Sequence, residues 1–486
     1  MEKKLDKRIA TGVPGLDEII YGGFIPERAY LVRGGPGTGK TTLGLHYLAA
    51  GAVDKEQGLF ICMGEQEEGI RENAGTMGID LGNVVFLDLS PDPESFSRME
   101  NYSIFSPAEV ERTPITQKIM EQIEKLKPNR IFIDSMTQFR YLSADSFQFR
   151  RQAASFLRFL TEQGTTVLFT SESCPDMPDD DLMFLSDGII ELEANDEDHR
   201  LTVRKFRGSG FHTGRQFVRL NSSGMEVFPR LLPKGVRGKV STEAIPTGVP
   251  ELNELLHGGL ERGTITIISG PSGVGKTTLG LLFLREAAKR GEHPVLYAFE
   301  EGMPTLINRC EAINIHIRDM MEQGSLSVVK VEPLIHSPEE FTRMVRKEVE
   351  EQGARVVMLD STAGYGLSIR GGDLIRHLHA LCKYLAELGV TTILINEVEF
   401  ITGEFRATEI GVSYIADNII FMRYLELNAQ LKKAIGVLKK RLSDFEKNLR
   451  EIKITPNGVE IGPPLTGLRG ILKGMPETIE SLNDEE

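Results

Sequence analysis

Two glycine-rich segments of this 486-residue sequence carry residue types suited to binding phosphate. Residues 34–41 read GGPGTGKT and residues 270–277 read GPSGVGKT, and both fit the pattern GxxxxGK[ST]. Glycines let backbone N–H groups turn towards phosphate oxygens, the following helix directs its positive end at the anion, and the lysine reaches the β- and γ-phosphates. We therefore predict two nucleotide-binding loops, formed by Gly34, Gly35, Gly37, Thr38, Gly39, Lys40, Thr41, Thr42, Gly270, Ser272, Gly273, Val274, Gly275, Lys276, Thr277 and Thr278.

Each loop is accompanied by residues that could hold Mg²⁺. In this motif the hydroxyl groups of Thr41 and Thr277 are metal ligands. Asp134 and Asp360 each follow a short apolar run and each precede a serine. An aspartate at the end of a buried strand can orient the Mg²⁺ shell directly or through water. We predict this role for both aspartates, with an ordinary turn cap as the alternative.

Hydrolysis also needs a group that positions or deprotonates water. In the second half, Glu300 and Glu301 follow an apolar run, and close carboxylates raise each other's pKa, which favours a base. At the corresponding place in the first half stand Gly64 and Glu65, so one of the two carboxylates is missing. We expect slower hydrolysis in the first half, or a dependence on Glu65, with solvated loop acids as the alternative.

An internal repeat places all these residues in equivalent positions. Between residues 11–45 and 247–281, which are 236 residues apart, 17 of the 35 positions are identical. A segment with two prolines, two glycines and several basic residues precedes the second copy and is typical of an exposed linker. We predict a first domain over 1–238, a second over 239–466, and a disordered acidic tail over 467–486.

The apolar pattern of each half alternates between strands and helices. Residues 131–133 and 356–359 are short apolar runs typical of strands buried on both faces. Residues 377–388 place apolar side chains on one helical stripe, and Gly389 then ends the helix. Such alternation predicts an α/β fold in each half, with a mostly parallel twisted sheet flanked by helices.

Composition excludes several other classes of protein. The sequence has no apolar run long enough to cross a membrane, its first residues do not resemble a signal peptide, and its four cysteines lack CxxC spacing. We therefore expect a cytoplasmic protein without a disulfide framework or a His/Cys metal site. The formal net charge of −14 makes a nucleic-acid partner less favourable, since DNA is held mainly through its phosphates.

Taken together, these residues resemble the KaiC family of tandem RecA-like ATPases over about residues 8–465. The resemblance rests on the motifs TGVPGLDEIIYGG (11–23) and TGVPELNELLHGG (247–259), both phosphate loops, both Asp-Ser pairs and the Glu-Glu pair. It implies two RecA-like domains in series that use ATP and Mg²⁺. It also implies self-association, typically into a homohexamer of stacked rings with ATP at the subunit interfaces.

Two basic pairs fit that implied assembly. Lys205 and Arg207 in the first half correspond to Lys439 and Arg441 in the second, and in this family such a pair resembles a finger that reaches the neighbouring subunit's nucleotide. Residues two apart on a strand point to one face, which suits that role. Surface basic pairs are the alternative, more so in the second half, where Leu442 replaces a glycine.

The resemblance also suggests a serine/threonine kinase activity. Aligning residues 416–420 with the family's strand places Ser413 and Tyr414 where the family carries neighbouring phosphorylated Ser and Thr residues. Ser413 is therefore a candidate for autophosphorylation, with an unmodified serine as the alternative. Two other functions stay open: a DNA-dependent recombinase or helicase on the same fold, and an ATP-gated signalling scaffold with unidentified regulatory protein partners.

Overall fold

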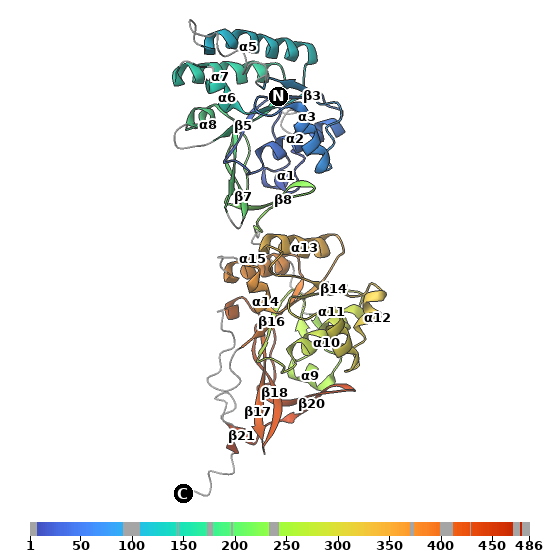
Figure 1. The fold of residues 1–486 in the computed structure, drawn as a ribbon. Helices are drawn as coiled ribbons and strands as arrows, with labels where there is room; N and C mark the ends of the chain where they lie inside the picture. Colours follow the sequence, from blue (N-terminus) through green and yellow to red (C-terminus); the bar gives the residue numbers. More distant parts are fainter. Residues whose placement is uncertain are drawn as a thin grey trace. The chain divides into compact units, whose positions relative to one another are not determined.

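The chain folds as two compact units that divide between Arg230 and Leu231, and each is considered by itself (Figure 1). The computed structural model describes residues 7–90, 107–141, 143, 145–172, 178–195, 198–232, 243–369, 374–398, 412–427, 429–469 and 477–478. Residue 238, the boundary predicted from the sequence, lies outside these ranges.

The first unit alternates strands and helices up to β6 and ends in antiparallel strands. Its helices are α1 (Leu16–Ile19), α2 (Lys40–Val53), α3 (Glu67–Thr76), α5 (Pro107–Leu126), α6 (Met136–Tyr141), α7 (Ser146–Glu162) and α8 (Asp180–Leu185). Its strands are β1 (Ala29–Gly34), β2 (Gly58–Cys62), β3 (Val85–Asp88), β4 (Arg130–Asp134), β5 (Thr166–Glu172), β6 (Gly188–Ala194), β7 (His199–Phe206), β8 (Gln216–Asn221) and β9 (Gly224–Phe228).

The second unit repeats this plan. Its helices are α9 (Pro250–Leu255), α10 (Lys276–Lys289), α11 (Met303–Glu311), α12 (Ile317–Glu322), α13 (Pro338–Glu350), α14 (Thr362–Leu367), α15 (Leu374–Glu387) and the 3₁₀ helix η2 (Val412–Tyr414). Its strands are β10 (Ala244–Ile245), β11 (Leu260–Glu261), β12 (Ile265–Gly270), β13 (Val295–Ala298), β14 (Ser327–Lys330), β15 (Val356–Asp360), β16 (Thr391–Glu397), β17 (Asn418–Leu427), β18 (Gln430–Lys440), β19 (Arg450–Thr455), β20 (Gly458–Pro464), β21 (Leu468–Arg469) and β22 (Glu477–Thr478).

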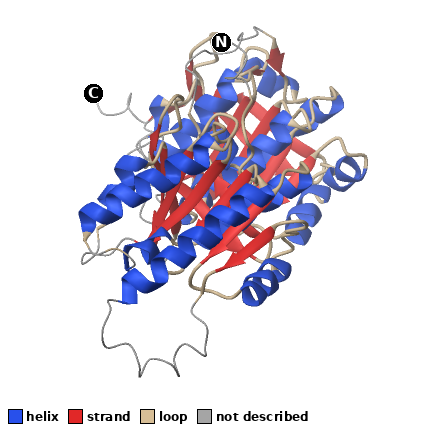
Figure 2. Cartoon of the chain, turned by 90° about the horizontal axis from the view of Figure 1, so that it is seen from above, coloured by secondary structure: helices blue, strands red, loops and turns tan. Residues whose placement is uncertain are grey.

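Both units contain a sheet of nine strands with the same order. In the first unit the order is β3-β2-β4-β5-β1-β6-β7-β8-β9, and in the second it is β14-β13-β15-β16-β12-β17-β18-β19-β20. The pairs from β3 to β6 are parallel and those from β6 to β9 are antiparallel. This topology confirms the predicted α/β fold with two mostly parallel sheets, whose strands run between helices (Figure 2).

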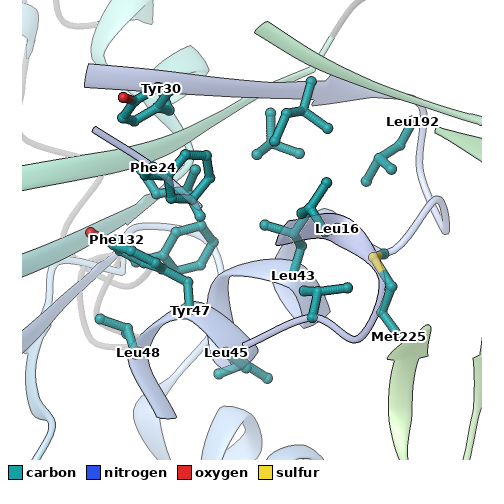
Figure 3. Packing of buried hydrophobic residues seen from close by; sticks show 14 of the residues in the cluster. Leu16, Phe24, Tyr30, Leu43, Leu45, Tyr47, Leu48, Phe132, Leu192 and Met225 are labelled. Carbon is teal, nitrogen blue, oxygen red and sulfur yellow. The ribbon is translucent and has the colours of Figure 1, made fainter. Parts of the chain in front are cut away.

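Each sheet is buried on both faces because its central strands are apolar in succession. In β1, Tyr30 and Val32 face the core beneath α1, α2 and α3, whereas Leu31 faces the core beneath α5 and α7. Figure 3 shows the first of these cores, in which Phe24 stacks on Tyr30 with ring centroids 4.3 Å apart. The apolar cores on both faces of β1 therefore hold the strand, and with it the residue at which the strand ends, in a fixed position.

The helix that follows each phosphate loop lies unusually close to the sheet. A Cβ atom added at Gly44 of α2 would lie 2.1 Å from the Phe132 ring of β4, and one added at Gly280 of α10 would lie 2.6 Å from Met358 of β15. Only glycine permits this approach. It brings the start of each helix next to the strand that ends in Asp134 or Asp360.

Within the described ranges, no helix is long and apolar enough to cross a membrane. Of the segment expected to be a disordered tail, the structure describes residues 467–469 and 477–478. In that segment β21 pairs with β22 in an antiparallel two-stranded sheet.

Candidate functional site

Both phosphate loops connect the carboxyl end of a central strand to the amino end of a helix. In the first unit the loop joins β1 to α2, and in the second it joins β12 to α10. The residues before the helices, Gly39 and Gly275, have φ values of 92° and 115°, a left-handed conformation that favours glycine. Neither helix is capped by a side chain at this residue, so first-turn N–H groups are available to an anion.

The two loop lysines fold back onto their own loops. The Nζ atom of Lys40 donates to the carbonyl oxygens of Gly34 at 2.9 Å and Gly35 at 2.8 Å, and that of Lys276 donates to Pro271 at 2.8 Å. Burial lowers the pKa of both lysines, although neighbouring carboxylates oppose the change. Each ammonium group is thus held where a phosphate chain would lie along the loop.

The predicted metal ligands come together in both units. In the first unit the Thr41 hydroxyl donates to Oδ2 of Asp134 at 2.6 Å. In the second unit burial raises the pKa of Asp360 to about 6, while a hydrogen bond from Thr277 and the charge of Arg309 act against the rise. In both units the hydroxyl and the carboxylate thus converge at the start of the helix, as the sequence predicts.

These oxygen atoms fit a Mg²⁺ ion that is carried by a nucleotide. Magnesium prefers oxygen ligands and usually takes only one or two carboxylates from a protein, with phosphates and water completing its shell. Among the described residues, no group of three or more His, Cys, Asp or Glu side chains is arranged to hold a metal ion. The donor set is thus too small for a separate metal centre and suits an ion shared with phosphate.

The two carboxylates of the second unit have different partners. The Ser361 hydroxyl donates to Glu300 at 2.6 Å. Arg309 on α11 forms a two-pronged ion pair with Glu301, with distances of 3.1 Å and 2.6 Å, and also donates to the Thr278 hydroxyl at 3.3 Å. Glu301 is thus paired with a cation, whereas Glu300 accepts a hydrogen bond from a neutral hydroxyl.

The first unit has an open cavity at the same place. This cavity of about 270 Å³ is lined by Lys40, Thr41, Phe60, Cys62, Gly64, Glu65, Ile70, Asp134, Ser135, Gln138 and Glu172. The N–H of Met63 donates to the Asp134 carbonyl as that of Phe299 does to Asp360, so Gly64 is the structural counterpart of Glu300. The exposed Glu65 is the carboxylate that remains from the predicted acidic pair, and it lines the cavity.

The predicted basic fingers lie far from the loop of their own unit. Lys205 lies at the end of β7 opposite Ile189, beside the first residues of β1, whereas the loop follows the last residue of β1. Through Ile189, Lys205 is level with Leu31, which lies three residues before Gly34, or roughly 10 Å at about 3.3 Å per residue. Arg207, just after β7, lies 3.6 Å from Asp187. These cations therefore lie towards the end of the strands opposite the loop of their own unit.

In the second unit the basic pair Lys439 and Arg441 lies at the equivalent place, and Ser413 lies beside it. Lys439 donates to the carbonyl oxygens of Ala416 at 2.7 Å and of the half-buried Ser413 at 3.2 Å. Arg441 lies 3.4 Å from Asp417 and donates to the Tyr414 carbonyl. The predicted phosphate acceptor and the predicted finger thus lie side by side, at the edge of the sheet opposite their own phosphate loop.

Three residues of the site were missed from the sequence: Arg309, Glu172 and Glu397. Arg309 lies eight residues after Glu301, and the two side chains meet only because residues Met303–Glu311 form helix α11. Glu172 and Glu397 each end the strand beside the loop strand, so extending the repeat comparison to those strand ends could have found them.

Comparison with known proteins gives matches to both units. A protein-family model described as "ATPase: KaiC" matches residues 9–231 and 245–466. A protein of Prochlorococcus marinus named "Circadian clock oscillator protein KaiC" is 27% identical over 97% of this chain and 96% of its own. Proteins of that name from Acaryochloris marina and Thermostichus vulcanus are 26% and 27% identical, over 98% and 97% of this chain and 94% and 92% of their own.

Proposed function

The chain belongs to the KaiC family of ATPases, and from this premise we propose that both units bind ATP with Mg²⁺ at the interfaces of a self-assembled ring. In this proposal the second unit hydrolyses ATP faster than the first. The observation that carries the binding of ATP is the duplicated arrangement of loop lysine and Thr–Asp pair at the carboxyl edge of a parallel sheet, where such sheets bind ligands.

Each step of binding has residues of this chain to perform it. The loop N–H groups and Lys40 or Lys276 surround the phosphates, and Thr41 with Asp134, or Thr277 with Asp360, holds the metal ion. When bound, Mg²⁺ would neutralise charge on the phosphate oxygens.

Water activation falls to the carboxylates of the neighbouring strand. Glu300 accepts a hydrogen bond from Ser361 and so is oriented to accept a proton from an attacking water. In the first unit Glu65 must do this without a counterpart of Glu300, since Gly64 occupies that place. The difference between the two units therefore concerns the hydrolytic step more than the binding of the phosphates.

The position of the basic pairs supports self-assembly. Lys205 with Arg207, and Lys439 with Arg441, lie at the edge of the sheet opposite their own loops. The side chains of Arg207 and Arg441 are 56% and 45% exposed. A ring in which one subunit's basic edge meets the next subunit's loop would complete each site with positive charge.

The function can be tested with the full-length chain. We expect it to bind a slowly hydrolysed ATP analogue at two classes of site, to form larger particles with ATP and Mg²⁺, and to release phosphate. Lys276→Ala should remove most of the turnover, whereas Lys40→Ala should mainly weaken assembly. Failure to bind the analogue would refute the proposal, and equal losses of turnover in the two variants would refute the difference between the units.

We further propose that Ser413 accepts phosphate from ATP bound to a neighbouring subunit. Its support is the contact of Ser413 with Lys439, the finger residue that would reach that nucleotide. Mass spectrometry after incubation with ATP and Mg²⁺ tests this directly, with Ser413→Ala as the control. An unmodified Ser413 in a preparation that turns over ATP would refute the kinase activity.

A further inference from the structure

In both units a further carboxylate lies beside the phosphate loop. Glu172 ends β5 directly opposite Gly34, the last residue of β1, and Glu397 ends β16 directly opposite Gly270, the last residue of β12. The two glutamates therefore occupy equivalent places. They belong to a different strand from the metal-binding aspartates and from the water-activating glutamates.

In the second unit this carboxylate faces the loop lysine. Oε2 of Glu397 lies 3.9 Å from Nζ of Lys276, and the lysine side chain is only 7% exposed. Glu397 is 39% exposed, so solvent reaches it while the lysine is almost enclosed. An enclosed ammonium group needs a nearby negative charge, and Glu397 supplies one where no phosphate is bound.

The first unit contains the same pair of groups. Glu172 and Lys40 line one cavity, and the negative charge of Glu172 acts on Lys40 together with that of Asp134. The N–H of Glu172 donates to the Thr137 hydroxyl at 3.0 Å, which fixes the backbone from which the carboxylate extends. Two independent copies of the fold thus place a carboxylate next to the loop lysine.

Such a carboxylate competes with the phosphates of a nucleotide. When a triphosphate enters, the lysine must turn from the glutamate to the phosphate oxygens, and the glutamate is left facing a like charge. Both effects weaken binding. They weaken binding of a triphosphate more than that of a diphosphate, because the γ-phosphate brings additional charge near the lysine.

We propose that Glu172 and Glu397 are counter-ions that position the loop lysine in the nucleotide-free site and lower the affinity of that site for ATP relative to ADP. This inference rests on the proposed binding of ATP. It gives each site a built-in means of releasing unhydrolysed nucleotide, and of keeping the loop in order until the next nucleotide binds.

The test replaces the charge and keeps the shape. Binding of a slowly hydrolysed ATP analogue and of ADP, both with Mg²⁺, is measured on the full-length chain and on Glu397→Gln and Glu172→Gln. We expect each variant to bind the triphosphate about tenfold more tightly at one class of site, with a smaller change for ADP. Glu322→Gln, which removes an exposed charge at the end of α12 in the second unit, is the matched control.

The outcomes separate this inference from the proposed function. Unchanged or weaker triphosphate binding by Glu397→Gln would overturn the inference, since that is the result expected if the carboxylate helped to hold the metal ion. Equal tightening for ATP and ADP would overturn it too, since a general change in the fold of the site would act on both. If the wild-type chain bound no nucleotide at all, the proposed function would fall first.

Discussion

Substituting Gly64 with glutamate should give the first unit a carboxylate that the second unit already has. A Cβ atom at Gly64 would meet no other atom within 4 Å, and this glycine is not in the left-handed conformation, so a side chain fits without strain. Ser135 lines the same cavity, in the place from which Ser361 donates to Glu300 in the second unit. The new carboxylate would therefore find a hydroxyl partner already in position.

The size of the gain follows from the role of the group. A positioned general base typically contributes about 10²- to 10⁴-fold to a rate. Glu65 already supplies one carboxylate to this cavity, so we expect only part of that range. A tenfold increase in the turnover of the first unit corresponds to about 1.4 kcal/mol of activation free energy.

The assay must isolate the first unit. Phosphate release is measured in a Lys276→Ala background, in which the second loop lacks its lysine, with and without Gly64→Glu. Gly69→Glu is a matched control, because it adds the same charge to the same unit at a glycine whose Cβ would also meet no atom within 4 Å. Analogue binding by both variants is measured in parallel, to separate turnover from affinity.

Two results would refute the reasoning. If Gly64→Glu left phosphate release unchanged while analogue binding was intact, the missing carboxylate would not be what slows the first unit. If Gly69→Glu raised the rate as much as Gly64→Glu, the gain would come from added negative charge and not from a positioned base.

Two further predictions concern the ion pairs of the second unit. Arg309→Met removes the two-pronged partner of Glu301, so we expect a loss of about 1 kcal/mol in the free energy of unfolding, measured by thermal unfolding with Arg309→Lys for comparison. Glu261 is almost fully buried with Lys440, and although burial alone would raise its pKa, hydrogen bonds from Ser443 and Lys440 bring the pKa below its usual value. The contribution of ionised Glu261 to the stability of the fold is thus complete above the unfolded-state pKa of about 4.3. This contribution is lost as the pH falls through the lower pKa of the folded state. When the free energy of unfolding is measured in urea from about pH 6 to about pH 3, it should accordingly fall more steeply for the wild type than for Glu261→Gln. Equal slopes of that free energy against pH would contradict the assignment.

Local sequence patterns were enough to predict the architecture. Apolar runs, glycine loops and the repeat are contiguous signals, and they led to the α/β fold that both sheets confirm. The pairing of Thr41 with Asp134 could also be expected, because parallel strands carry their carboxyl ends to one edge.

The partners of the acidic residues could not be predicted in the same way. Two adjacent glutamates suggested mutual repulsion, but Glu301 is paired with Arg309 from a helix whose orientation depends on the packing of the whole unit. Glu397 reaches Lys276 only because β16 and β12 pair in a particular register. Contacts of this kind depend on tertiary packing and leave no periodic signal in the sequence.

Among the residues of the site, the two units differ near the carboxylates assigned to the hydrolytic step. Both units keep the loop lysine, the Thr–Asp pair and the carboxylate beside the lysine. They differ at Gly64 and Glu300, and also where Asn73 of α3 takes the place of Arg309 on α11. Without an arginine in that place, Glu65 lacks the ion pair that holds Glu301. Divergence at these positions would leave the loop lysine and the Thr–Asp pair common to both units while their rates of hydrolysis changed independently.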